Sequence, residues 1–473
     1  MTGFPPGFCF LTRHEDVEDS AEIREITILC RGSACPLLEC RTSIERRPTH
    51  TLRPHVPRGS LLPSDHHMKI AQVNKYLYPK GGADVYCLRL AKLLRQKGHD
   101  LVLMGMEPPE DEEVEFPAYT VPRIDYDAEL SRREQLRTAA GFIYSRRAAR
   151  TMARLIRRER PDLVHFQNVY HQLSPSVILT AWSMGVPTVM TLHDYKITCT
   201  VYSHFRNGTV CEECRGGRFY NTVRWRCARG SLLKSLLGAA EMYLHRGLLK
   251  SYQKLDARIA PSRFLQRKVR ELGFPAGIQH VPNFVEIDDY TPRYDWQDRQ
   301  IVYVGRLSRE KGLPTLLTAV QGLDVHLRVI GRGPLEDALH RQANANGLDN
   351  VTFEGYQSGE RLRRMVAASM FTVVPSEWYE NNPLVIHESF ALGKPVVGAN
   401  IGGIPELIGR GRGICYRAGD REALRDAIVE LAGDERRIKE MGRSARRFAE
   451  ERLSPEAHYG ALMNIYRQIT TAN

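Results

Sequence analysis

The stretch Pro375-Ser-Glu-Trp-Tyr-Glu380-Asn-Asn-Pro-Leu-Val-Ile-His-Glu388-Ser-Phe390 decides the fold, because it joins a strand to a helix through a polar loop. The β-branched run from Phe371 to Pro375 predicts a short buried parallel strand that ends at the proline. Asn382 before Pro383 predicts a helix N-cap and a first helical residue, after which apolar residues recur at helical spacing. The local pattern is therefore strand, loop and helix.

The two carboxylates of this stretch take different positions in that unit. Glu380 falls in the loop, and Glu388 falls in the second turn of the helix. Free backbone N–H groups and the positive end of a helix dipole at the carboxyl edge of a sheet suit a diphosphate. Glu388 can then accept hydrogen bonds from ribose hydroxyls, and Glu380 lies nearer the sugar–phosphate junction. Carboxylates at this spacing also occur on solvated helix surfaces, so the interpretation depends on context.

Two further segments supply that context. Upstream, Val302-Tyr-Val-Gly305-Arg306-Leu-Ser-Arg-Glu-Lys311-Gly312 predicts a strand, a turn, two cations and a helix. Downstream, the predicted strand from Pro395 to Ala399 leads into the glycine loop Gly402-Gly-Ile-Pro-Glu406. The carboxyl ends of parallel strands meet at one edge of a sheet, so we expect the three loops to converge on one crevice.

With these motifs the chain resembles the GT-B glycosyltransferases of family 4, a retaining and metal-independent group, from about Met68 to the C-terminus. The resemblance implies an α/β fold of two Rossmann-like doubly wound domains that face each other. It implies transfer of a sugar from a UDP- or GDP-sugar to a glycan or lipid-linked acceptor, in the synthesis of cell-surface polysaccharide or glycolipid. It also implies residue roles: Arg306 and Lys311 neutralise the donor diphosphate, Glu388 binds the ribose, Glu380 contacts the transferred sugar, and Gly402, Gly403 and Ile404 line the phosphate pocket.

The first half of the chain offers two more candidates. Gly81 and Gly82 follow the predicted first strand and open an amphipathic helix, where glycines let a ligand approach the backbone, although such a pair is also an ordinary turn. His193 ends a predicted strand, a position typical of chemistry in α/β enzymes, and a single histidine is otherwise a structural residue. The resemblance implies that His193 contacts the donor sugar and Gly82 a donor or acceptor group. Asp194 is interpreted as the orienter of His193 or as a helix cap.

Length sets the domain organisation. Of the 473 residues, 473 − 67 = 406 follow position 67, which suits two domains of about 200 residues. The predicted parts are residues 68–283 as an acceptor domain, 284–455 as a nucleotide-sugar domain, and 456–473 as a helix that crosses back to the first domain. The chain has no apolar run long enough to span a membrane and no signal-peptide core, so a cytoplasmic location is expected.

Residues 1–67 do not fit this plan. They are rich in Arg, Pro and His and show no sustained period, which indicates either a disordered extension or a mis-assigned upstream translation. Their four cysteines, Cys9, Cys30, Cys35 and Cys40, match no metal-site spacing and receive no function.

A cysteine-rich insertion follows His193. Residues 198–230 hold few apolar side chains and four cysteines, Cys199, Cys211, Cys214 and Cys227, with the spacing C-x11-C-x2-C-x12-C. Four thiolates with one close pair favour a structural Zn²⁺ that takes no part in catalysis. Reduced thiols packed under the loop and a disulfide remain alternatives, the latter disfavoured in the cytosol.

The charge of the chain is concentrated in one segment. Between Ser131 and Arg160 there are ten Arg and two Glu, which gives 10 − 2 = +8, and apolar residues recur at helical spacing. The pattern predicts a helix with one packed face and one basic face, either simply solvated or attached to an anionic membrane surface. Nucleic-acid binding lacks a supporting motif and is not expected.

Two other functions remain open. A non-catalytic protein of the same fold that recruits partners at a membrane would be expected to lose Glu380, Glu388 or the Arg306 and Lys311 pair, all of which are present. A nucleotide-sugar epimerase of the same fold would need no acceptor. Neither the donor base and sugar nor the acceptor is fixed by these motifs.

Overall fold

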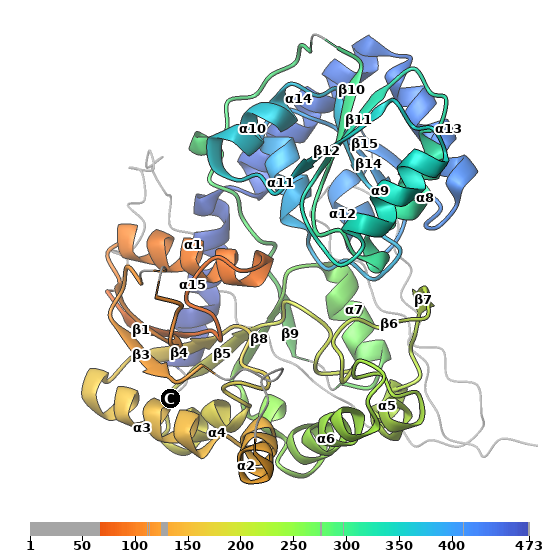
Figure 1. Cartoon of the computed structure of the whole chain (residues 1–473). Helices are drawn as coiled ribbons and strands as arrows, with labels where there is room; N and C mark the ends of the chain where they lie inside the picture. The colour runs from red at the N-terminus through yellow and green to blue at the C-terminus, as the bar shows by residue number, and fades with distance from the viewer. Residues whose placement is uncertain are drawn as a thin grey trace, which may run out of the picture. The chain divides into compact units, whose positions relative to one another are not determined.

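The computed structural model describes residues 67–110, 112, 114–123, 131–274, 277–296, 298–409 and 411–471. The predictions for residues 1–66, including the four N-terminal cysteines, lie outside these residues. The described chain forms two parallel α/β domains, as the sequence predicts, each built around one sheet with helices packed on it (Figure 1).

The first sheet has seven strands in the order β3-β2-β1-β4-β5-β8-β9, and all of its pairings are parallel. The order turns at β1, which pairs with β2 on one side and β4 on the other, as in a doubly wound sheet. The strands are β1 (Lys69–Val73), β2 (Asp100–Met106), β3 (Ala118–Val121), β4 (Leu163–Phe166), β5 (Thr188–Thr191), β8 (Ala257–Ala260) and β9 (Ile278–His280). The helices are α1 (Gly82–Gln96), α2 (Arg132–Ile143), α3 (Arg146–Glu159), α4 (Ser176–Ser183) and α7 (Arg263–Glu271).

The second sheet has six parallel strands in the order β12-β11-β10-β13-β14-β15. They are β10 (Gln300–Val304), β11 (His326–Ile330), β12 (Val351–Gly355), β13 (Phe371–Val374), β14 (Val396–Ala399) and β15 (Gly413–Tyr416). Its helices are α8 (Leu313–Ala319), α9 (Glu336–Ala345), α10 (Gly359–Ala367), α11 (Leu384–Ala391), α12 (Ile404–Ile408), α13 (Arg421–Ala432) and α14 (Glu435–Arg452). The strands β10, β13 and β14 are neighbours at the centre of this sheet.

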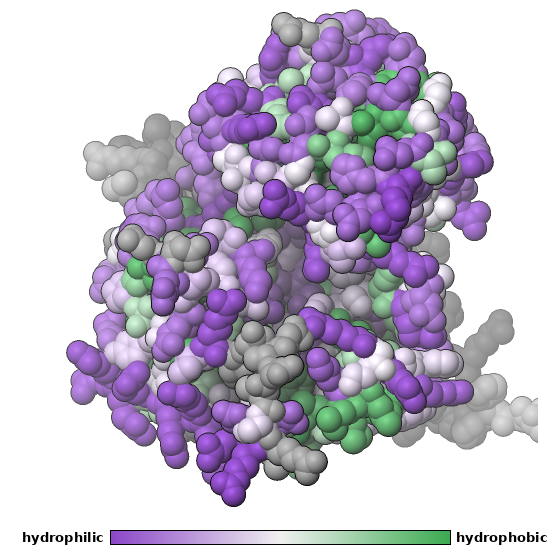
Figure 2. All heavy atoms as spheres, viewed as in Figure 1, coloured by the Kyte–Doolittle hydropathy of each residue, from purple (hydrophilic) through white to green (hydrophobic). Residues whose placement is uncertain are grey.

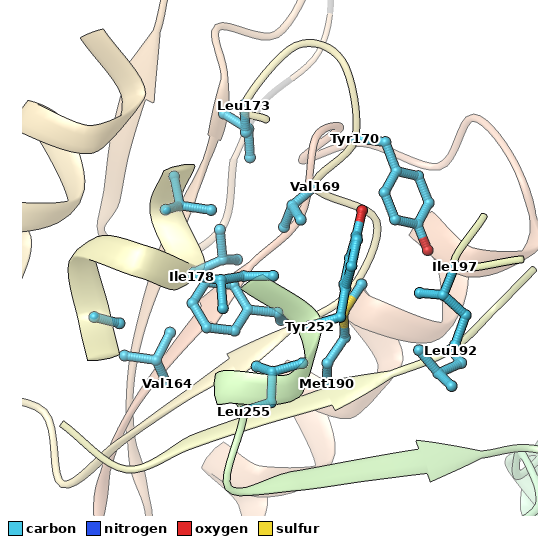
Figure 3. Close-up of a cluster of buried hydrophobic side chains, with 14 of the residues drawn as sticks. Val164, Val169, Tyr170, Leu173, Ile178, Met190, Leu192, Ile197, Tyr252 and Leu255 are labelled. Carbon is cyan, nitrogen blue, oxygen red and sulfur yellow. The ribbon is translucent and has the colours of Figure 1, made fainter. Parts of the chain in front are cut away.

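Each sheet has apolar clusters on its faces. Figure 3 shows one of them, in which Val164 of β4 and Met190 of β5 meet Ile178 of α4 and Leu255. Burial of a side chain of this size stabilises the fold by roughly 1.5–3 kcal/mol. On another face of the first sheet, Leu462 and Tyr466 of the last helix, α15 (Pro455–Thr471), join Ile70 of β1 in one cluster, and α15 lies beside α1 (Figure 1).

An insertion separates β5 from β8. It contains the two-stranded antiparallel ribbon β6 (Phe205–Arg206) and β7 (Thr209–Val210), then α5 (Tyr220–Arg224) and α6 (Leu232–Met242). The π-helical turn η2 (Tyr243–Leu248) continues α6 without a break, and η3 (Ser251–Lys254) leads to β8. Further short turns are η1 (Arg215–Gly217), η4 (Ile287–Asp289) and η5 (Arg309–Lys311).

Two local predictions were wrong. Asn382 is not the N-cap of α11: Pro383 holds that position without a side-chain bond, and the Asn382 side-chain oxygen accepts from the Asn283 backbone N–H at 3.0 Å. The Arg-rich segment 131–160 is two helices, because the Ser145 hydroxyl caps a new helix by accepting from the Ala148 N–H. A tertiary partner in the first case and a local cap in the second override the helical period.

Candidate active site

The loops after β10, β13 and β14 meet, because these strands are adjacent and parallel. Their central contact is an ion pair between Lys311 Nζ and Glu380 Oε1 at 2.6 Å. The Ser376 hydroxyl donates to the same oxygen at 2.7 Å. Burial raises the pKa of Glu380, but Lys311 and the hydrogen bonds outweigh it and hold the pKa below its ordinary value of 4.5. Glu380 is thus an ionised carboxylate at neutral pH, beside a lysine whose side chain is 24% exposed.

The glycine loop closes directly over Glu380. The Gly403 N–H donates to the Glu380 carbonyl at 2.7 Å. A Cβ on Gly402 would lie 2.3 Å from that carbonyl oxygen, and a Cβ on Gly403 would lie 1.8 Å from the Asn381 oxygen. These positions require glycine because two backbones approach closely there. The structure therefore brings together Glu380, Lys311, Gly402 and Gly403.

Asn381 links this loop to the first sheet. Its Nδ2 donates to the carbonyls of Leu192 and His193 at 3.0 and 3.1 Å, and the Ser262 hydroxyl donates to its Oδ1 at 2.8 Å. His193 follows β5, as the sequence predicts for a residue at a strand end. One amide side chain thus connects the predicted sugar-contacting histidine to the backbone next to Glu380.

The His193 ring has a fixed partner. Its Nε2 donates to Gln167 Oε1 at 2.7 Å, so Nδ1 is the acceptor in the neutral ring. Burial lowers the pKa of His193 to about 3, which keeps the ring neutral at physiological pH. Asp194 does not orient this ring: its Oδ1 accepts from the Lys196 backbone N–H at 2.9 Å. Of the two interpretations of Asp194, the role as orienter was wrong, because its carboxylate instead closes the turn that follows β5.

Glu388 lies in α11, where it meets the first domain. Arg89 of α1 places Nη2 at 3.2 Å from Glu388 Oε1 and Nε at 3.3 Å from Glu286 Oε2. Arg89 loses solvation there, but the two carboxylates raise its pKa above the ordinary value. Gly82, at the first position of α1, faces the same helix, since a Cβ there would lie 3.8 Å from Leu384 Cδ1.

Arg306 and Ile404 contribute in different ways. The Arg306 side chain is exposed and has no ion-pair partner within the described part of the chain. Its backbone oxygen accepts from the Tyr303 hydroxyl at 2.9 Å. The Ile404 side chain is fully buried in the core with residues of β14, and its backbone N–H donates to the Ile401 carbonyl at 3.3 Å.

The four insertion cysteines surround one small cavity of about 20 Å³. Burial, with neighbouring cysteines adding to it, raises the pKa of Cys214 to about 12 and that of Cys227 to about 11. In residues 67–471, as far as they are described, no three His, Cys, Asp or Glu side chains form a group that holds a metal as they stand.

Sequence reasoning missed three residues of this region: Arg89, Gln167 and Asn381. Asn381 lies inside the quoted stretch, where its polar type was the only signal. Arg89 is one of several cations on an amphipathic helix, and Gln167 ends a strand. Each acquires its place through partners more than 25 positions away in the chain.

Two family models match this chain. The model "Glycosyltransferase Family 4" matches residues 80–289, and "Glycosyl transferases group 1" matches residues 291–448. The fold and these matches place the chain in a class, the GT-B α/β proteins with two parallel sheets. Within that class, the chain belongs to glycosyltransferase family 4.

Individual relatives agree with this assignment. An alpha-D-kanosaminyltransferase of Streptomyces kanamyceticus is 32% identical over 37% of this chain and 48% of its own length. An MMP alpha-(1->4)-mannosyltransferase of Mycolicibacterium hassiacum is 26% identical over 82% of this chain and 95% of its own length. The chain spans about half the length of the first curated relatives that it matches. The solved structure of Anabaena HepE in complex with UDP and glucose superposes with a TM-score of 0.58, at 20% identity, over 86% of this chain and 99% of its own.

Proposed function

We propose that this protein transfers a sugar from a nucleoside diphosphate sugar to a glycan or lipid-linked acceptor, with retention at the anomeric carbon. The observation that carries the proposal is the meeting of three strand-end loops at Lys311 and Glu380, with Asn381 tied to His193. Family membership supports it, as does the UDP in the related HepE structure. The ligand-binding experiment described below identifies the donor base and sugar.

The charges suit a departing diphosphate. Lys311 is partly exposed beside Glu380, and Arg306 extends into solvent from the adjacent loop. Cations held in place where negative charge develops lower the barrier without reorganisation, and one such group is worth about 10²–10³ in rate. We therefore expect Arg306 and Lys311 to stabilise the leaving diphosphate and the reaction to proceed in the presence of a chelator. Gly402 and Gly403 bring backbone to the same place.

The reaction we propose is attack on the same face of the sugar. The bond from the anomeric carbon to the β-phosphate oxygen breaks, the bond to the acceptor oxygen forms, and the acceptor proton moves to the leaving phosphate. His193 is neutral, so its free Nδ1 accepts a hydrogen bond from a sugar hydroxyl. Glu380 is ionised, so it accepts hydrogen bonds from the sugar or stabilises positive charge at the anomeric carbon.

Glu388 has a more specific role in this proposal. A carboxylate in the second turn of α11 suits the two hydroxyls of a ribose, and in the structure it already bonds to Arg89. Arg89 therefore competes with the ribose for Glu388 or shifts to share it. A ligand can change the arrangement only through such a difference in contacts.

Ligand binding tests the proposal directly. Thermal shift with UDP, GDP and their sugars identifies the base, because a ligand at 100 times its Kd stabilises the native state by about 2.7 kcal/mol. Product analysis then separates the alternatives. A transferase releases the nucleoside diphosphate and, with water as acceptor, free sugar of retained configuration. Binding without any turnover favours the recruiting protein, and an altered sugar without acceptor favours the epimerase. No stabilisation by any nucleotide would refute the proposal.

We also propose that Cys199, Cys211, Cys214 and Cys227 hold a structural Zn²⁺. Four sulfurs around one small cavity are the donor set that zinc prefers, and bound zinc would keep as thiolates groups that burial otherwise protonates. Side-chain rotation is needed to bring them to ligand spacing. Elemental analysis of protein purified without added metal tests this: about one zinc per chain is expected, and none in Cys214→Ser with Cys227→Ser. If the wild-type protein contains no zinc and has the same melting temperature with and without added zinc, the four cysteines are packed thiols.

A third proposal concerns the basic helices. The exposed arginines of α2 and α3 would attach the protein to an anionic membrane, where a lipid-linked acceptor resides. No helix among the described residues is long and apolar enough to cross a bilayer. We expect the protein to sediment with anionic vesicles and to be released by salt. The double variant Arg146→Gln with Arg150→Gln should bind the vesicles more weakly.

A further inference from the structure

The segment from Leu232 to Leu248 exposes its large apolar side chains. Within α6 and η2, Leu232, Leu233, Leu236, Tyr243 and Leu248 are 52%, 75%, 55%, 45% and 78% exposed. We call these five residues the leucine face. Figure 2 shows apolar side chains gathered over α6. Exposed apolar side chains gathered in this way mark an interaction site rather than ordinary surface.

The inner side of α6 combines small residues with one carboxylate and one methionine. Its buried residues are Ser235, Gly238, Ala239, Glu241 and Met242. A Cβ on Gly238 would lie 2.7 Å from Thr200 Cγ2, so the helix packs closely on the first part of the insertion. Three leucines of α6 are therefore exposed while its one carboxylate, Glu241, is buried, which departs from the usual amphipathic order.

A buried ion pair fixes this orientation. Lys196 Nζ lies 2.6 Å from Glu241 Oε2, both side chains are fully buried, and Nζ also donates to the Thr200 carbonyl at 3.1 Å. Turning α6 to bury its leucines would carry Glu241 away from Lys196. Lys196 would then be buried without a counter-charge, which is strongly unfavourable. The leucine face therefore points outward as a consequence of the fold, not of a loosely held helix.

Positive charge lies next to the leucine face. Lys234 and Lys250 are exposed within and just after the segment. The helix α2 packs against α6, and the His245 ring of η2 donates to the Ile143 carbonyl at the end of α2, at 2.7 Å. Beyond that contact, α3 begins with exposed Arg146 and Arg147.

Few acidic side chains lie in the described parts of these four elements. Within α2, α3, α6 and η2, where described, the acids are Glu134, Glu159 and Glu241. Glu134 closes the capping box of α2, Glu159 pairs with Lys69, and Glu241 is buried. An apolar strip with the exposed cations Lys250, Arg146 and Arg147 nearby is complementary to an anionic lipid surface, in which acyl chains lie beneath negative headgroups.

We propose that the leucine face inserts into the interface of an anionic lipid bilayer, with α6 lying in the plane of the membrane and α2 and α3 contacting headgroups. The proposal rests on the membrane contact proposed above and deepens it, because it assigns the inserting element to the insertion after β5. Without insertion, attachment would depend on charge alone and would be lost in salt.

Vesicle sedimentation tests this, with vesicles of phosphatidylcholine alone and of phosphatidylcholine with equal phosphatidylglycerol. The leucine variant, designed to lose insertion, is Leu233→Ser with Leu236→Ser and Leu248→Ser. The matched control is Tyr356→Ser with Val429→Ser, which removes apolar side chains that are 65% and 51% exposed in the second domain. Wild type and control are expected to bind anionic vesicles, with a fraction resisting high salt. The leucine variant is expected to bind anionic vesicles at least tenfold more weakly and to lose the salt-resistant fraction, while its melting temperature and nucleotide binding stay unchanged.

Several outcomes would overturn the proposal in distinguishable ways. Equal, fully salt-sensitive binding by wild type and the leucine variant would leave charge attachment in place and refute insertion. If the wild type binds no vesicles, both insertion and attachment by charge are refuted. Light scattering measures the oligomeric state. If the wild type is a dimer, the leucine variant is a monomer and neither binds lipid, the leucine face is a contact with a second copy and the proposal is refuted. Unchanged nucleotide binding in every case leaves the proposed transferase function standing.

Discussion

Two lysine–glutamate pairs in this molecule have the same length and opposite surroundings. Lys311–Glu380 and Lys196–Glu241 are both 2.6 Å apart, but the first pair is 24% and 7% exposed and the second is fully buried. The pKa of Glu380 is lowered because its partners outweigh burial, whereas burial dominates at Glu241 and raises its pKa. The accessible lysine can still meet a ligand anion. The buried pair can act only within the fold, where it orients α6.

Breaking the buried pair should have the largest effect. Glu241→Ala leaves Lys196 buried without a counter-charge, so we expect a loss of about 3–5 kcal/mol in the free energy of unfolding. Urea denaturation measures it. The double variant Lys196→Met with Glu241→Leu should recover most of the loss, because neither charge then remains buried. If the single and double variants are equally unstable, packing rather than charge explains the site.

Removing the accessible lysine should affect turnover instead. Lys311→Ala is expected to lower the rate with a nucleotide-sugar donor about a hundredfold, since one charge-stabilising group is lost. The loss in unfolding free energy should be smaller than for Glu241→Ala, because Glu380 keeps its bond from Ser376. Steady-state kinetics gives the rate, and Lys439→Ala, at an exposed pair, is the control. Wild-type turnover in Lys311→Ala would remove Lys311 from the mechanism.

The loop that closes over Glu380 should tolerate no side chain. Gly403→Ala places a Cβ 1.8 Å from the Asn381 oxygen, so the loop must shift, at a cost of roughly 1–3 kcal/mol. Gly460→Ala, in α15 with open space around it, should instead stabilise by up to about 1 kcal/mol. Thermal melts of both variants make the comparison. A Gly403→Ala protein as stable and as active as wild type would mean that this backbone contact is dispensable.

The two glutamates should give opposite pH dependence, a smaller effect. The lowered pKa of Glu380 means that its stabilisation is complete above 4.5 and is lost as pH falls through the lower folded value. The advantage of wild type over Glu380→Gln should therefore shrink on acidification. For Glu241 the folded pKa is raised, so the folded state holds its proton longer, and the advantage over Glu241→Gln should fall as pH rises above 4.5. Melting temperatures across pH 3–7 check both signs; parallel curves would contradict the assignment.

The sequence predicted the site unevenly. It placed Glu380, Lys311, Gly402 and Gly403 in loops that follow three predicted strands, because glycine, proline and β-branched runs mark the ends of these elements locally. It could not pair Glu388 with Arg89, which lies 299 positions away. It also misjudged Asn382, whose side chain bonds to Asn283 rather than capping α11. The domain limits and the residue roles in catalysis remain predictions.

The sequence by itself determined the strand and helix alternation, the class of fold and the loops that carry charge, since each follows from short-range period and turn chemistry. Tertiary structure alone decided which distant groups meet: Asn381 with His193, Arg89 with Glu388, and Lys196 with Glu241. It also decided that the leucines of α6 face outward, because Glu241 of the same helix is held in a buried ion pair that helical periodicity does not reveal.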